Sequence, residues 1–164
     1  MKLLRENITG QEPIVKTEFD IVREGDMLHC YWYAHDSSLT SFCDYDNGEL
    51  YNADVVEIFI DVGDGNSYLE IEVAPNGKKF VAEIVNRQIN FIDNSFVKPN
   101  VEIKGNDYIV TMDIDLSRFN VIKPIEYNAF RVETCGKEPN YVLSALSPTY
   151  CGSFHVRDKF ILLK

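Results

Sequence analysis

An all-β, antiparallel β-sandwich of about nine or ten strands is the fold class that this sequence predicts. Three observations lead to it. Apolar and polar residues alternate with a period of two along much of the chain, turn residues interrupt the alternation, and only residues 116–119 resemble a turn of helix. The 164 residues, of which 45% are hydrophobic and 26% charged, fit one globular domain spanning residues 1–164.

The first predicted strand pair covers residues 14–23 and 27–36, which flank a short turn that contains a glycine. Trp32, the single tryptophan, alternates with apolar neighbours in the second strand. It is therefore expected in the core, while His29 and His35 fall on the opposite face, toward the solvent.

The segment 55–62 shows the alternation most clearly. One face carries Val56, Ile58, Ile60 and Val62, and the other carries Glu57, Phe59 and Asp61. The next strand, 68–73, places Leu69, Ile71 and Val73 on one face and Tyr68, Glu70 and Glu72 on the other. A turn at 63–66 joins the two strands so that apolar residues meet across the pair and Glu57 meets Glu72.

The following turn, at residues 75–78, contains the dipeptide Asn76-Gly77, which is typical of a two-residue hairpin. This register sets Val73 opposite Phe80, Ile71 opposite Ala82 and Leu69 opposite Ile84. The predicted result is a three-stranded meander with one apolar face in the core and one acidic, aromatic face in water.

Later segments continue in the same style. Residues 101–104 and 108–114 flank a Gly-Asn turn and predict a second hairpin, and residues 127–134 and 160–163 predict the last strands.

The composition limits the partners of the protein. Sixteen Lys and Arg against 26 Asp and Glu give a net charge of −10, alongside nine Tyr and ten Phe. Such a surface repels phosphate backbones and anionic lipids, so nucleic-acid and membrane partners are not expected. No segment resembles a signal-peptide core or a membrane span. We expect a cytoplasmic protein, or an extracellular one if the sequence is a trimmed piece; the sequence does not determine the oligomeric state.

The four cysteines are Cys30, Cys43, Cys135 and Cys151. They are widely spaced and form no CxxC pair, so zinc ligation is not expected. We expect free and mostly buried thiols rather than disulfides.

Four segments along the chain share a recognisable pattern. They are YNADVVEIFID at 51–61, YLEIEVAPNG at 68–77, YNAFRVE at 127–133, and a closing run with Ser147-Pro148-Thr149, Phe154-His155 and Phe160. Together they resemble family 9 carbohydrate-binding modules and their stand-alone relatives. The resemblance implies a jelly-roll-like β-sandwich that binds sugars without cleaving them, so enzymatic activity is not expected.

The resemblance also implies site residues. In this family two aromatic rings hold the reducing end of a glycan, with polar side chains at the rim. Tyr51 occupies the place of the first ring. Glu57 matches the strand glutamate that contacts sugar hydroxyls, and Arg131 matches the late arginine.

The second ring is the main departure from the family pattern. Leu146 stands where a tryptophan is usual, and Tyr141 or Tyr150 is the candidate replacement. Glu70 and Glu72 are expected to line the same face as the site.

A sugar site of this kind matches the composition. Aromatic rings stack on the C–H face of a sugar, and carboxylates accept hydrogen bonds from its hydroxyls. The acidic chain therefore suits a neutral mono- or oligosaccharide and would repel an acidic glycan. The resemblance also implies structural calcium, for which Asp44 and Asp46 are the candidate ligands, with a plain acidic turn as the alternative.

Each site residue has a second interpretation. Glu57, Glu70 and Glu72 also fit an exposed, solvated sheet face, Tyr51 fits a packing role at the rim, and Arg131 fits a structural partner of a carboxylate.

Three other function classes were compared with the sequence, and two of them fit parts of it. Paired carboxylates on one face suit a glycoside hydrolase. The substitution at Leu146 suits a structural or partner-binding sandwich with a degenerate sugar site. A haem site is disfavoured, because Met27 and His29 lie two residues apart on one strand and point the same way.

Overall fold

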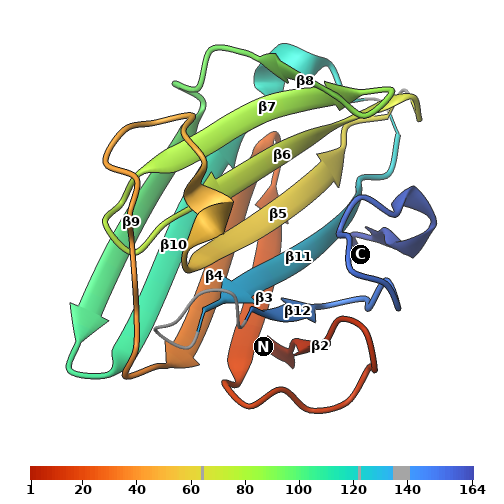
Figure 1. Ribbon diagram of the computed structural model, residues 1–164. Helices are drawn as coiled ribbons and strands as arrows, with labels where there is room; N and C mark the ends of the chain where they lie inside the picture. Colours follow the sequence, from red (N-terminus) through yellow and green to blue (C-terminus); the bar gives the residue numbers. More distant parts are fainter. Residues whose placement is uncertain (64, 122, 135–140) are drawn as a thin grey trace.

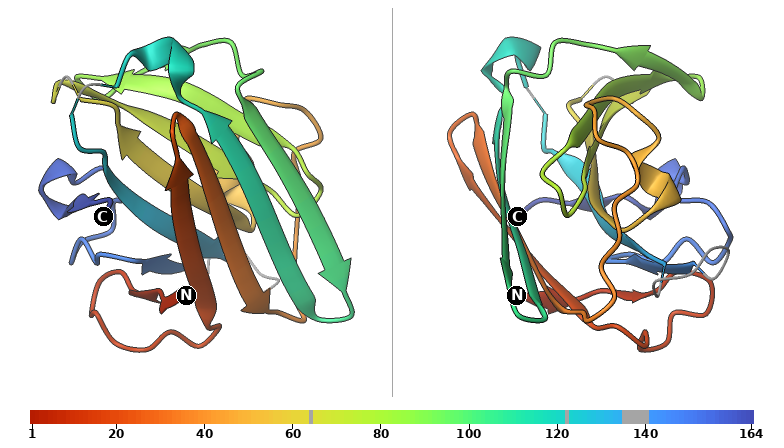
Figure 2. Two further views of the ribbon diagram at one scale, coloured as in Figure 1. Left: turned by 180° about the vertical axis from the view of Figure 1, so that it is seen from behind. Right: turned by 60° about the vertical axis from the view of Figure 1, so that its left-hand side comes forward.

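Two antiparallel sheets stacked face to face form the body of the protein (Figures 1 and 2). They are seen in a computed structural model that describes residues 1–63, 65–121, 123–134 and 141–164. No helical segment in these residues is long or apolar enough to cross a lipid bilayer. The all-β, antiparallel sandwich is therefore confirmed.

The first sheet has five strands in the order β1-β3-β4-β10-β9. Their bounds are Lys2–Leu3 for β1, Thr17–Glu24 for β3, Met27–His35 for β4, Asp107–Asp115 for β10 and Val97–Lys104 for β9. Buried and partly exposed residues alternate along β4. Trp32 is 1% exposed and its ring packs 4.7 Å from that of Phe19 on β3, which confirms its predicted core position.

The second sheet has eight strands, with β2-β12-β11-β5-β6-β7-β8 in order and β13 paired to β11. Their bounds are Arg5–Glu6 for β2, Val142–Ala145 for β12, Glu126–Glu133 for β11, Val55–Asp61 for β5, Ser67–Val73 for β6, Lys79–Val85 for β7, Gln88–Phe91 for β8 and Ile161–Leu162 for β13. Three 3₁₀ turns complete the described chain: η1 Leu50–Asn52, η2 Ser117–Phe119 and η3 Arg157–Lys159. The predicted helical turn near residue 117 is η2.

The described residues form thirteen strands, more than predicted. The strands that the sequence pattern missed, β1, β2, β8 and β12, are two to four residues long. A period of two cannot be recognised over so few residues.

The β5–β6 register is the predicted one: Ile58 pairs with Ile71, and Glu57 pairs with Glu72. The predicted β6–β7 register is wrong by one residue. Val73 pairs with Lys79, and Phe80 pairs with Glu72.

The turn between β6 and β7 explains the shift. The backbone N–H of Gly77 donates to the carbonyl of Ala74, and Gly77 has a φ of 80°. This is a three-residue loop, a type I turn with Pro75 in its favoured second position followed by a left-handed glycine. The expected two-residue turn needs a positive φ at Asn76 as well, which Asn76 does not have.

The register shift matters because it moves Phe80, Ala82 and Ile84 to the same face as Glu70 and Glu72. These three residues belong to a second apolar cluster on the outer face of the eight-stranded sheet, separate from the core between the sheets. The segment around η1 and the C-terminal segment cover this outer face (Figure 2).

Every residue of β5 is consequently buried, on both faces of the sheet. The prediction that the acidic face of the meander lies in water is wrong. A strand with alternating apolar and polar residues can be buried on both sides when distant segments of the chain fold over its polar face, which a local pattern does not reveal.

Among the described cysteines, Cys30, Cys43 and Cys151 are free, as expected. Only Cys30 is buried, so the expectation of mostly buried thiols is wrong for these three. Cys135 lies outside the described residues.

Candidate functional site

Three carboxyl groups meet on the outer face of the eight-stranded sheet. Glu57 on β5 lies directly opposite Glu72 on β6. Glu70 precedes Glu72 by two residues and lies on the same face of β6. Each group offers an oxygen within 4.8 Å of the other two. The three side chains, here called the carboxyl triad, are only 3%, 7% and 1% exposed for Glu57, Glu70 and Glu72, respectively.

The triad is electrostatically costly, because like charges directly across a strand pair repel and burial removes their hydration. Burial raises the pKa of Glu57 well above its usual value, with the charges of Glu72 and Glu70 adding to the effect. Burial also raises the pKa of Glu72 well above normal. The pKa of Glu70 rises to about 7, because burial outweighs a hydrogen bond with Glu72. The triad therefore holds protons near neutral pH.

A cavity of about 460 Å³ opens above the triad. Its walls are mostly aromatic and aliphatic, and they come from β5 to β8, β11, β12 and the segments beside them. The lining residues other than the triad are Tyr51, Asn52, Phe59, Phe80, Ile89, Val132, Tyr141, Leu143, Gly152, Ser153, Phe154 and His155. An apolar cleft of this size with a few convergent polar groups is typical of a small-molecule site.

Two tyrosines stand at the cavity. Tyr51 in η1 is 47% exposed, and its pKa is raised by partial burial first and then by nearby charges that include Glu72 and Glu70. Tyr141 is 39% exposed, and its hydroxyl donates to the carbonyl oxygen of Asn52 at 3.3 Å. The structure therefore brings Tyr51, Tyr141 and the three predicted glutamates to one cavity.

His155 lines the cavity and links the C-terminal segment to the sheet. Its ring stacks on Phe59 with 5.1 Å between centroids, and its Nδ1 lies 2.6 Å from the Tyr68 hydroxyl. Burial lowers the pKa of His155. The imidazole is thus neutral at pH 7, and it fixes the wall of the cavity rather than adding charge to it.

The sequence interpretation missed most of the apolar wall. The wrong β6–β7 register placed Phe80 on the opposite face of the sheet, away from the glutamates. Ile89 lies on β8, a strand that was not predicted. A type I turn with Pro75 and a left-handed Gly77 was the available signal for the correct register.

Arg131 lies elsewhere. It pairs with Val56 across β11 and β5, so its side chain points between the two sheets, away from Glu57. It is 1% exposed and does not line the cavity. The prediction that Arg131 shares the site with Glu57 is wrong, because a shift of one residue along a strand reverses the face.

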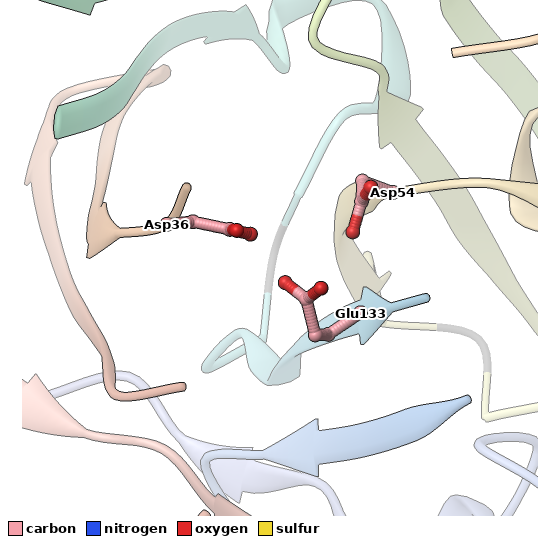
Figure 3. Close-up of side chains that lie close together, drawn as sticks. All are labelled: Asp36, Asp54 and Glu133. Atoms are coloured by element: carbon pink, nitrogen blue, oxygen red, sulfur yellow. The ribbon is translucent and has the colours of Figure 1, made fainter. Parts of the chain in front are cut away.

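Arg131 instead sits among three buried carboxyl groups, those of Asp36, Asp54 and Glu133. Figure 3 shows these groups pointing toward one another. The guanidinium donates to Asp36 and, at 2.6 Å, to Glu133, and it lies 3.7 Å from Asp54. The chain itself thus supplies a cation to this cluster, and Arg131 is a structural partner of Glu133, as the alternative interpretation expected.

Calcium fits neither acidic cluster well. Arg131 already occupies the centre of one cluster, and calcium takes about six to eight oxygens whereas the triad has three carboxyl groups under mostly apolar walls. Asp44 and Asp46 belong to neither cluster, and Asp46 accepts a hydrogen bond from the backbone N–H of Lys79. Calcium binding by Asp44 and Asp46 stays a prediction.

Leu146, at the family's position for the second ring, and Tyr150, one candidate replacement, both lie outside the cavity. Leu146 packs against the core between the sheets, and Tyr150 packs against Gly10 and Lys159. Of the residues proposed for that ring, only Tyr141 lines the cavity.

Solved structures share this fold. A Bacteroides uniformis protein, named for an inferred carbohydrate-binding role, superposes with a TM-score of 0.80 at 18% identity, over 98% of this chain and 83% of its own. A family 9 carbohydrate-binding module from Caldicellulosiruptor kristjanssonii in complex with cellotriose gives 0.63 at 18% identity, over 88% of this chain and 70% of that one. Such a module from the same organism in complex with glucose gives 0.69 at 15% identity, over 99% and 83%.

No family profile matches the sequence, and no curated protein matches it. The structural similarities confirm the predicted fold, a sandwich like that of family 9 modules. At this level of identity they concern the fold alone.

Proposed function

We propose that this protein binds a carbohydrate, without cleaving it, in the cavity above the carboxyl triad. The observation that carries the proposal is the combination in one cavity of exposed aromatic rings with buried carboxyl groups. Rings stack on the apolar face of a sugar, and carboxyl groups bond its hydroxyls.

The fold supports the same conclusion by analogy. The two Caldicellulosiruptor modules were solved with cellotriose and with glucose. In the present chain, Tyr51 and Tyr141 would contact the sugar ring, while the triad would receive its hydrogen bonds. An acidic glycan would be repelled by the net charge of −10.

Replacing Tyr51 with alanine should weaken sugar binding by about tenfold or more, because the variant loses a stacking surface and its apolar contact. Isothermal titration calorimetry with the best ligand from a glycan array measures the change. Tyr31→Ala is the matched control, since Tyr31 is a partly exposed tyrosine on β4 of the other sheet and faces away from the cavity. Equal affinity of the Tyr51 variant and the wild type would place the site elsewhere.

A glycoside hydrolase is a second candidate, and one observation favours it. Glu70, with a pKa of about 7, has the character of a general acid, and it lies close to two further carboxyl groups. Release of reducing sugar from an oligosaccharide, abolished by Glu57→Gln or Glu70→Gln, would establish the enzyme and overturn the proposal of binding alone.

A further inference from the structure

The floor of the cavity concentrates acidic groups without a positive charge to balance them. The described residues that line it include no lysine or arginine, and its one histidine has a lowered pKa because it is buried. None of the triad carboxyl groups takes part in an ion pair among the described residues, in contrast to the second cluster, where Arg131 forms ion pairs with the carboxyl groups.

Glu72 provides an independent sign of a missing partner. It is 1% exposed, it lines the cavity, and its Oε2 has no hydrogen-bond partner among the described residues. A buried acceptor of this kind is destabilising unless a ligand supplies a donor.

We propose that the cavity prefers a sugar that carries a free, protonated amine, with the ammonium group bound by Glu57, Glu70 and Glu72. This inference rests on the proposed carbohydrate binding and specifies the class of sugar. It replaces the expectation of a neutral ligand, which came from the overall composition rather than from the buried groups.

The spacing of the triad suits an ammonium group. A nitrogen with three N–H donors in tetrahedral directions and charge-assisted bonds of about 2.8 Å places its acceptors about 4.6 Å apart. The triad offers three oxygens that lie no more than 4.8 Å from one another, so all three can converge on one nitrogen. A hydroxyl donates a single hydrogen bond and brings no charge, so a neutral sugar serves the same three acceptors less well.

The walls suit the remainder of such a ligand. Phe59, Phe80 and Phe154 surround the triad with apolar surface, which strengthens a charged hydrogen bond by excluding water. Tyr51 and Tyr141 leave ring surface exposed for the pyranose. An N-acetyl group would remove the charge and one or more donors, and it would enlarge the group at the floor.

The test is calorimetry at pH 7.5, above the pKa of about 7 of Glu70, in EDTA, with glucose, glucosamine, 6-amino-6-deoxyglucose and N-acetylglucosamine. At least one of the two amines should bind about tenfold tighter than glucose, and N-acetylglucosamine should not. Glu72→Gln and Glu70→Gln should abolish this preference, because glutamine keeps the shape and removes the charge. Glu102→Gln, which removes an exposed acid on β9, should keep the preference and so excludes general attraction by the acidic surface.

The outcomes separate this inference from the proposed function. If glucose binds and neither amine binds more tightly, the ammonium site is overturned and carbohydrate binding stands. If no member of the glycan array binds, the proposed function fails as well. A sugar affinity that appears only when calcium replaces EDTA would assign the triad to a metal and overturn the ammonium site.

Discussion

Replacing Arg131 with methionine should destabilise the folded protein by about 3–5 kcal/mol, the usual cost of removing one partner of a buried ion pair. Asp36, Asp54 and Glu133 would then share a buried site without a cation. Arg131 also spans the two layers, since its guanidinium lies 5.0 Å from the centre of the Tyr108 ring on β10. The loss is measured by urea unfolding.

The effect should depend on pH. Burial raises the pKa of Glu133 to about 7, so lowering the pH to 6 protonates this group and removes part of the repulsion in the variant. The destabilisation should therefore be larger at pH 8 than at pH 6.

Arg118→Met is the matched control for Arg131. Arg118 forms an ion pair with Asp93 at 3.1 Å, but both side chains are largely exposed. Such pairs contribute about 0–1 kcal/mol, so little stability should be lost. Equal losses in the two variants would contradict the structural role of Arg131. Under conditions in which the Arg131→Met variant is folded, it should bind sugar with the affinity of the wild type, because the Arg131 side chain does not line the cavity.

Raising the pH from about 5 to 8 should lower the stability of the ligand-free protein by about 2.5 kcal/mol from Glu70 alone. Its pKa rises from 4.5 to about 7 on folding, chiefly because the side chain is buried. Between these values the folded state keeps a proton that the unfolded state has lost, so stability is full below pH 4.5 and is lost as the pH approaches and passes 7. Glu57 and Glu72, whose pKa values are raised further, extend the loss to higher pH.

Urea unfolding at several pH values measures this dependence. Glu70→Gln should make the profile less steep, because an amide of the same shape does not ionise, while Glu57 and Glu72 still contribute. Glu102→Gln should retain the wild-type slope, since Glu102 is exposed and paired with Lys104. A wild-type profile that rises between pH 5 and 8 would show that the triad is ionised and compensated in the folded protein. A tightly bound amino sugar should flatten the wild-type profile as well, because the ammonium group stabilises the ionised triad.

The sequence by itself determined the alternation along β5 and β6, and with it the pairing of Glu57 with Glu72 and the shared face of Glu70. These features follow from the two-residue period of a strand, which is local and needs no other part of the chain. The candidate ring residues Tyr51 and Tyr141 came from the family resemblance, and the structure brings both to the cavity.

Only the tertiary structure decided that the acidic face is buried, because Phe154 reaches it from the distant C-terminal segment and Leu50 folds over it from the turn before β5. It also decided the side of the sheet on which Arg131 lies, since the apolar and polar residues of β11 do not alternate clearly enough to distinguish its two faces. The same glutamates that would be ordinary on a wet surface become groups with strongly raised pKa values under an apolar cover. Desolvation depends on what covers a side chain, and that cover is assembled only when the chain folds.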